Sequence, residues 1–184
     1  VNYECGIPDL LGSDLNHHYL QGSISQTFKI GTIGTSNYRL SGGKFLSAKI
    51  LRDPDFKFQR RSDPLWFSNP LYSFQGLDTL LRTSDLSIEA HFVHHDNGSI
   101  INKIPFMKKT RIGLVFGAGI LHVREHDWLH YEGLVGLERN FKLSRRRLRV
   151  GIYGVLSNAN KSAPRADWKI SFAILDDRNM KWDF

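Results

Sequence analysis

The feature that most constrains this chain is an uninterrupted alternation of side-chain character over residues 130–143. The two alternating sets are Tyr131, Gly133, Val135, Leu137, Arg139, Phe141 and Leu143 on one side, and His130, Glu132, Leu134, Gly136, Glu138, Asn140 and Lys142 on the other. The first set is mostly apolar, and the second is mostly polar or small. A side-chain period of two is produced by a β-strand, because an α-helix repeats every 3.6 residues. This stretch is therefore predicted to be a strand with two unlike faces.

The same alternation recurs along most of the chain. The predicted strands lie at 1–5, 18–30, 38–45, 84–95 and 168–174, with three more inside 111–156. Turn residues such as Gly, Asn and Asp separate several of them, which is typical of antiparallel hairpins. The sequence therefore predicts an all-β, antiparallel fold of about eight strands, within one unit that spans residues 1–184.

The unlike faces leave two settings open, because a soluble sheet buries its apolar face and a membrane β-barrel presents that face to lipid. No window approaches the roughly 18 consecutive apolar residues of a transmembrane helix, so a helical membrane protein is excluded. Transmembrane strands need only about ten alternating residues each. A mean hydropathy of -0.32 is therefore compatible with a barrel.

The connections favour the barrel. Three prolines, Pro54, Pro64 and Pro70, interrupt residues 47–84, which are predicted to form a long extracellular loop over a barrel mouth. Short connections at 31–34 and 144–146 alternate with longer ones, as in bacterial barrels with periplasmic turns and outer loops. Residues 176–184 are predicted to form a charged tail.

The net charge of the chain suggests nucleic acid as an alternative partner to lipid. The net charge of +7 and the pI near 9.6 are typical of proteins that bind nucleic acid or anionic lipid. The densest basic cluster includes Arg145, Arg146, Arg147 and Arg149. The alternative hypothesis is therefore a soluble basic β-domain that binds nucleic acid through Arg145–Arg149. Cys5 is the single cysteine, which excludes an internal disulfide and a cysteine-based zinc cluster.

Two neighbouring segments carry a family resemblance. Residues 89–98 read EAHFVHHDNG and residues 102–109 read NKIPFMKK. This pattern resembles the C-terminal barrel of a Bacteroidota outer-membrane family of unknown function, in which a strand ending in a His-His-x-Asn-Gly-like turn is followed by an Asn-Lys-Ile-Pro link. Longer members carry an N-terminal carboxypeptidase-regulatory-like domain, and their barrel is distantly similar to the surface-antigen barrels of outer-membrane assembly factors. The resemblance implies the C-terminal half of a larger transmembrane barrel, and a chain that starts at Val1 is expected to be a fragment.

In such a barrel the alternation divides the side chains between lumen and lipid. The predicted lumen-lining residues are Glu89, His91, Glu132, Glu138, Arg147 and Arg149. The predicted lipid-facing residues are Phe92, Val135, Leu137, Phe141, Leu148, Val150, Ile152, Trp168, Ile170 and Phe172. Salt bridges across a wet lumen explain the charged set better than a proton or substrate site does.

A catalytic reading has one motif in its favour. His122, Glu125 and His126 match H-x-x-E-H, the inverted zinc-peptidase signature, which requires a helix to bring both histidines to one metal. Here the motif lies where a strand runs into a loop, so we expect no catalytic, metal or cofactor site. The predicted function is a non-catalytic integral outer-membrane protein of a Gram-negative bacterium, a scaffold or accessory subunit of a transport, secretion or assembly complex. Its expected partners are outer-membrane lipid and other outer-membrane or periplasmic proteins, without nucleic acid.

Overall fold

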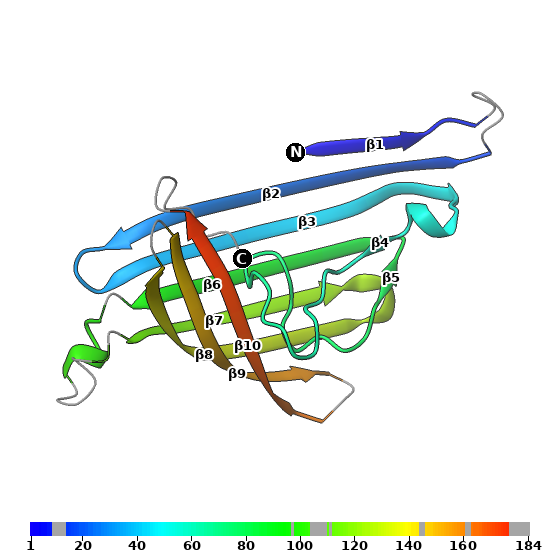
Figure 1. Cartoon of the computed structure of the whole chain (residues 1–184). Helices are drawn as coiled ribbons and strands as arrows, with labels where there is room; N and C mark the ends of the chain where they lie inside the picture. The colour runs from blue at the N-terminus through cyan, green and yellow to red at the C-terminus, as the bar shows by residue number, and fades with distance from the viewer. Residues whose placement is uncertain are drawn as a thin grey trace.

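The computed structural model describes residues 1–8, 14–96, 98–103, 110, 112–143, 146–160 and 163–176 (Figure 1). Eight strands form one sheet: β1 Asn2–Gly6, β2 Asn16–Ile30, β3 Gly34–Ile50, β6 Leu86–Asp96, β7 Ile112–Val123, β8 Trp128–Leu143, β9 Arg146–Ala159 and β10 Arg165–Asp176. Their order is β1-β2-β3-β6-β7-β8-β9-β10, and every neighbouring pair is antiparallel. The prediction of an all-β antiparallel fold with eight strands is confirmed.

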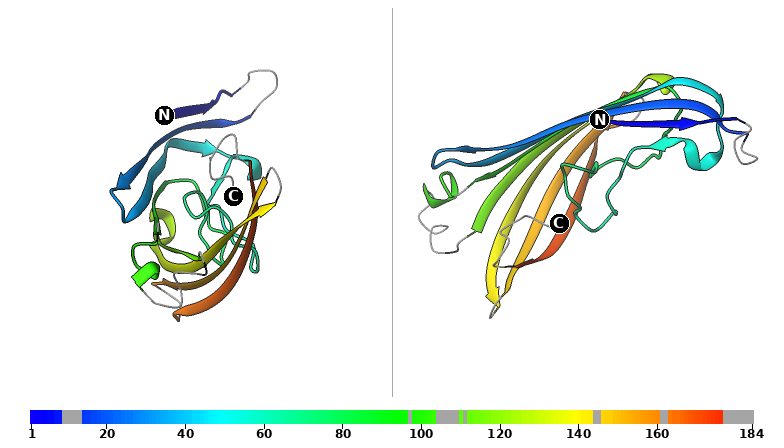
Figure 2. Two further views of the ribbon diagram at one scale, coloured as in Figure 1. Left: turned by 60° about the vertical axis from the view of Figure 1, so that its left-hand side comes forward. Right: turned by 90° about the horizontal axis from the view of Figure 1, so that it is seen from above.

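The sheet is open, with β1 and β10 at its two edges. It curls into a deep trough, which the two views of Figure 2 show from the end and from above. β1 pairs only with residues 17–21 of β2, so the outer edge of β2 extends well beyond its neighbour. The described residues thus form an open curved wall rather than a closed barrel.

The long connection between β3 and β6 starts later than the sequence predicts. β3 continues to Ile50, because Ala48 pairs with His17 of β2 past one register shift and Ile50 pairs with Asn16 past a second. The following residues include the short 3-10 helix η2 (Asp53–Asp55) and a separate two-stranded pair, β4 (Lys57–Phe58) with β5 (Arg82–Thr83). We call residues 59–81 the inner loop, because they lie inside the trough against its concave face (Figures 1 and 2).

Packing of the inner loop on the concave face makes the core. One cluster joins Phe67 and Leu71 of the loop to the wall residues Val93, Val115, Leu134, Tyr153 and Val155. A second cluster joins Phe74, Leu77 and Leu81 of the loop to Leu121, Val123 and Trp128. The loop therefore supplies the apolar partner that the concave face lacks within the sheet.

The convex face carries large apolar side chains that stay exposed. They are Ile24, Leu40, Ile88, Phe92, Phe116, Ile120, Leu129, Tyr131, Val135, Leu137, Phe141, Ile152, Leu156, Trp168, Phe172 and Ile174. Trp168 is 75% exposed and Ile152 is 57% exposed.

Two further 3-10 turns, η3 (Ile101–Lys103) and η4 (Arg124–His126), lie at opposite ends of β7. Among the described residues, no helix is long and apolar enough to cross a membrane.

Candidate functional site

The clearest candidate site is the contact between the inner loop and the concave wall, and Glu132 of β8 is its anchor. The Glu132 carboxylate accepts hydrogen bonds from the backbone N–H groups of Gln75 at 2.8 Å and Gly76 at 2.7 Å. The side chain of Glu132 is almost fully buried. Ser157 of β9 donates its hydroxyl to the Gly76 carbonyl at 3.2 Å. Two neighbouring strands therefore hold the backbone of one loop turn.

Aromatic rings surround this anchor. Phe74 of the loop lies with its ring centroid 4.4 Å from that of His91, and it meets the ring of His130 edge-on at 5.6 Å. Gly119 of β7 leaves the room for this packing, since a Cβ there would lie 3.2 Å from the Phe74 ring and 3.1 Å from Glu132. His130 Nε2 lies 3.4 Å from the Glu132 carboxylate. Rings of the loop and the wall therefore pack beside the anchor.

A second buried polar cluster is built around Glu138, further along β8. The Tyr153 hydroxyl donates to Glu138 at 2.5 Å and lies 3.2 Å from the Ser171 hydroxyl. His95 Nδ1 lies 3.7 Å from Glu138 Oε2, and Arg149 Nε lies 3.8 Å from the same oxygen. Four strands contribute to the cluster, so it ties the wall together across β6, β8, β9 and β10.

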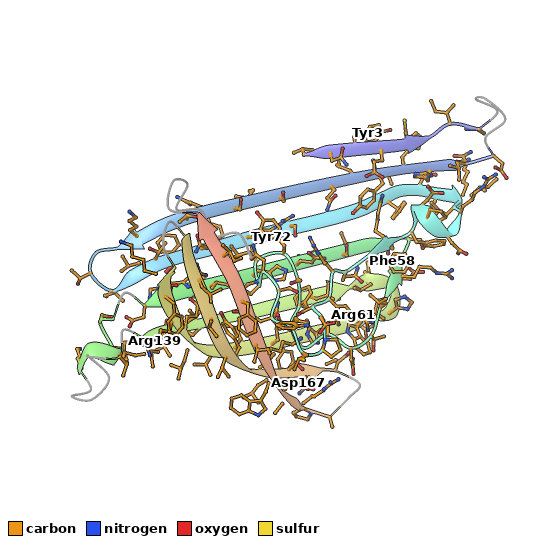
Figure 3. The ribbon with its side chains drawn as sticks, in the orientation of Figure 1. Tyr3, Phe58, Arg61, Tyr72, Arg139 and Asp167 are labelled. Carbon is orange, nitrogen blue, oxygen red and sulfur yellow. The ribbon has the colours of Figure 1, made fainter. Side chains whose placement is uncertain are left out.

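Tyr153 links this cluster to the inner loop. Its ring stacks on Phe67, with centroids 3.6 Å apart and planes 2° from parallel. The ring lies flat along the wall because Gly136 and Gly151 have no side chains, and a Cβ on Gly136 would approach it to 2.2 Å. At the other side of the trough, the Arg39 guanidinium lies 4.4 Å from the ring centroid of Tyr72, a loop residue labelled in Figure 3.

The loop also reaches the edge strand β10. Asp63 accepts hydrogen bonds from the backbone N–H groups of Trp66 and Leu65, and these bonds hold the pKa of its carboxyl group below its usual range. This turn directs Phe67 N to the carbonyl of Ile170 at 2.8 Å, while Ile170 N donates to the carbonyl of Leu65 at 3.0 Å. Lys169 Nζ donates to the Ser62 hydroxyl at 3.2 Å and to the Asp63 carbonyl.

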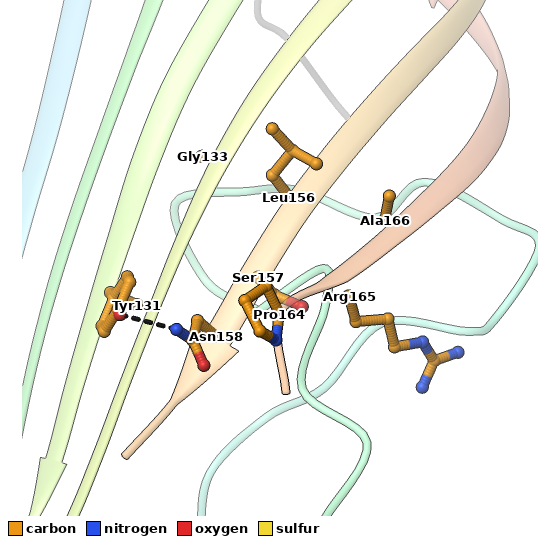
Figure 4. A pocket seen from close by; sticks show the side chains of 8 residues that line it. All are labelled: Tyr131, Gly133, Leu156, Ser157, Asn158, Pro164, Arg165 and Ala166. Carbon is orange, nitrogen blue, oxygen red and sulfur yellow. Dashed lines mark hydrogen bonds between the residues drawn. The ribbon is translucent and has the colours of Figure 1, made fainter. Parts of the chain in front are cut away.

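A groove of about 470 Å³ opens where β8, β9 and β10 meet at the end of the trough (Figure 4). It is lined by Tyr131, Gly133, Leu156, Ser157, Asn158, Pro164, Arg165 and Ala166. Asn158 donates to the Tyr131 hydroxyl at 2.7 Å, and Arg165 forms ion pairs with Asp167 and Asp78. Asn158 Oδ1, by contrast, is buried without a hydrogen-bond partner among the described residues.

Comparison with known proteins gives one match. The family described as "Family of unknown function (DUF5686) C-terminal domain" matches residues 1–137 of the 184. The chain belongs to this family. No curated protein and no solved structure matched the chain. The DUF5686 C-terminal domain thus includes β1 to β7 and the inner loop, and its match ends within β8.

The structure places most of the predicted site residues in two groups. Of the six predicted to line a lumen, His91, Glu132, Glu138 and Arg149 are buried on the concave face, and Glu89 is partly buried beside His91. Arg147 lies in β9 opposite Lys142, and its side chain is outside the described residues. The ten predicted to face lipid lie on the convex face in register with one another; Leu148, Val150 and Ile170 are partly buried there, and the others are exposed. A lumen and a lipid contact for these groups stay predictions.

The described residues test parts of the two alternative sites. Of the basic cluster at 145–149, Arg149 is 1% exposed beside Glu138, so it does not belong to a surface that could contact phosphates. Arg145 and the side chains of Arg146 and Arg147 lie outside the described residues. Glu125 accepts hydrogen bonds from Ser84, and His126 Nε2 lies 2.8 Å from the Arg82 carbonyl oxygen, so both face the β5–β6 connection. No group of three or more His, Cys, Asp and Glu side chains in the described part of the chain is placed to hold a metal ion.

Several residues of the site are absent from the residues predicted from the sequence. Tyr153, Lys169 and Ser171 share the concave face by alternation, and that signal could have added them to the predicted wall. The loop residues Phe67, Phe74, Gln75 and Gly76 carry no periodic signal. Only the folded loop brings them to the wall.

Proposed function

We propose that this domain is part of the wall of an integral outer-membrane β-barrel, the C-terminal half of a larger barrel whose interior is filled by the inner loop. Its function is non-catalytic: a scaffold or accessory subunit of an outer-membrane transport, secretion or assembly complex. The apolar convex face contacts lipid, and the concave face with its charged residues lines the interior.

The observation that carries this proposal is the contrast between the two faces of one sheet. The convex face exposes sixteen large apolar side chains over seven strands, from β2 to β10. A soluble domain rarely exposes a contiguous apolar surface of this kind. The concave face buries Glu132, Glu138 and Arg149 instead, which is the distribution expected of a barrel with lipid outside and a polar interior.

The likeness to a Bacteroidota outer-membrane family, and the more distant likeness to surface-antigen barrels, support the same proposal. The alternation of connections supports it as well. The turn at 31–33, the C-terminal end of β8 and the N-terminal end of β9 lie at one end of the trough, and the inner loop starts from the other end (Figure 1). The nucleic-acid alternative has less support, because Arg149 pairs with Glu138 in the interior.

Ile152→Arg in β9 tests whether the convex face meets lipid. In lipid vesicles we expect this change to lower the free energy of unfolding by about 2–4 kcal/mol, because a charge then lies near the bilayer midplane. Denaturant titration of the refolded full-length protein measures it. The matched control is Leu80→Arg in the inner loop, where the side chain is similarly exposed.

We expect Leu80→Arg to change stability by no more than about 0.5 kcal/mol, as exposed substitutions in water do. If Ile152→Arg is equally harmless in vesicles, the convex face is not in lipid and the barrel proposal is wrong.

A further inference from the structure

The free edge of β10 is occupied at one position, by the inner loop. Ile170 exchanges two backbone hydrogen bonds with Leu65 and Phe67, and Trp66 and Ile170 form an isolated parallel bridge. The Trp66 ring meets the Phe172 ring edge-on, with centroids 5.7 Å apart. We call residues 65–67 the edge guard.

The rest of this edge follows from the pairing of β10 with β9. The register is regular from Arg165 to Asp176, so backbone groups point alternately toward β9 and away from it. Because the N–H and C=O of Ile170 point away from β9, those of every second residue between Ala166 and Ile174 do the same: Ala166, Trp168, Phe172 and Ile174. Among the described residues, none of these four has a backbone partner on that side.

The edge guard is a poor substitute for a strand. It runs parallel to β10, whereas every other neighbouring pair in the sheet is antiparallel. It satisfies one of the five outward-facing positions between Ala166 and Ile174. Leu65 and Trp66 are about half exposed, so moving these two residues away from the edge uncovers little buried apolar surface. Phe67 is buried against Tyr153, so displacement breaks its backbone bond to Ile170 while its ring stays in the core.

We propose that the β10 edge binds an antiparallel strand of the same barrel wall, and that this strand displaces the edge guard from Ile170. The inference rests on the proposed function, since a barrel wall must pair every backbone group that faces lipid. An edge that is long, regular and mostly unpaired is a template for further strand pairing.

The side chains of β10 define the chemistry of this partner. Trp168, Phe172 and Ile174 are exposed on the convex side, so the residues beside them on the new strand are apolar. Lys169 and Ser171 are buried on the concave side, so the alternate residues of the new strand are polar or small. The partner is therefore a strand with the same alternation as β8 and β9.

Disulfide trapping tests the displacement. In a Cys5→Ser background, the pair Trp66→Cys and Ile170→Cys joins the edge guard to β10, because bridged residues place their side chains on one side of the sheet. The control pair is Ile152→Cys and Ile170→Cys, which are directly opposite in the β9–β10 register. Each double-cysteine variant is treated with an oxidant, once as this domain alone and once as the full-length protein in membranes. The measurement is the fraction of each variant that forms its disulfide.

We expect the control pair to form its disulfide in both preparations, and the 66–170 pair to form it only in the isolated domain. Equal trapping of the 66–170 pair in membranes would overturn the displacement, and so would its failure to form in the isolated domain. Loss of the control disulfide in membranes would show that β10 does not stay paired with β9, which also overturns the inference. A separate experiment tests the barrel proposal itself: if the full-length protein does not fractionate with membranes, that proposal fails whatever the disulfides show.

Discussion

Glu132 satisfies its buried charge with main-chain N–H groups, and its two oxygens are shared between Gln75 and Gly76. A carboxylate buried without donors is costly, whereas hydrogen bonds to the ionised form are among the strongest in proteins. His130 lies beside it and adds a polar neighbour. The inner loop and the wall therefore depend on each other at this residue: the loop supplies the donors, and the wall supplies the charge.

The substitution Glu132→Gln keeps the shape of the side chain but turns one acceptor oxygen into a donor. We expect it to cost about 1–3 kcal/mol, because one backbone N–H of the loop then faces an NH₂ group and loses its partner. Urea unfolding measures the loss, and protease cleavage within residues 59–81 reports release of the loop.

The matched control is Glu89→Gln, since Glu89 is only partly buried and accepts a hydrogen bond from Ser41 at 3.2 Å. A loss under about 1 kcal/mol is expected there, and equal losses for the two variants would show that the loop does not depend on Glu132.

At the scale of single elements, β8 shows how one strand serves two environments. Gly136 lies on the concave side beneath the Tyr153 ring, and Gly133 lies on the convex side at the groove, where a Cβ would meet nothing within 4 Å. The two glycines belong to the same strand, yet one is required for packing and the other leaves a space unfilled.

Gly136→Ala and Gly133→Ala are therefore a matched pair. We expect Gly136→Ala to destabilise the fold by about 1–3 kcal/mol, because its methyl group would push Tyr153 away from Phe67 and Glu138. We expect Gly133→Ala to stay within about 0.5 kcal/mol of the parent. Denaturant midpoints compare the two, and a larger loss for Gly133→Ala would mean that the faces of β8 are assigned the wrong way round.

The strands could be predicted from sequence because their evidence is local. Alternation between neighbours, such as Glu132 against Gly133, fixes which side chains share a face before any contact is known. It also gives the antiparallel order, since consecutive strands are joined by turns or loops without crossover helices. The ends of the strands could be predicted less well. β3 continues to Ile50, because its pairing with β2 persists through irregular positions where the alternation of side chains breaks off.

The contents of the trough could not be predicted in the same way. Phe67 meets Tyr153 at a sequence separation of 86 residues, and Gly76 meets Glu132 at a separation of 56, and neither loop residue belongs to a periodic pattern. The predicted position of residues 47–84 over a barrel mouth reflects their length and prolines, and these features do not specify a surface to pack on. The inner loop finds its place through buried rings and through single anchors such as Glu132.

At the scale of the whole molecule, the two faces of the sheet differ in what covers them. Its concave face is covered by its own inner loop, whereas its convex face has no cover in the described residues. Burying that convex surface in lipid gives the proposed barrel its driving force, because exposed apolar area is unfavourable in water.

Fractionation tests this arrangement directly. We expect the full-length protein to remain in the membrane pellet after high-salt and alkaline washes and to be released by detergent, because apolar contact with acyl chains is insensitive to salt. A basic nucleic-acid-binding domain would behave in the opposite way, since its electrostatic contacts weaken steeply with salt. Recovery of the full-length protein in the salt-washed soluble fraction would contradict the barrel.

The anchoring of the inner loop through its backbone has a consequence for how this domain can change over time. The Gln75 and Gly76 N–H groups exist whatever side chain follows them, provided that position 76 stays small enough to pass Ser157. Mutational tolerance is therefore unequal on the two sides of this contact: the wall must keep the Glu132 carboxylate, whereas the two loop donors do not depend on a particular side chain at position 75. The buried rings of Phe67 and Phe74 still constrain the loop, so its freedom to change lies at exposed positions such as Leu80.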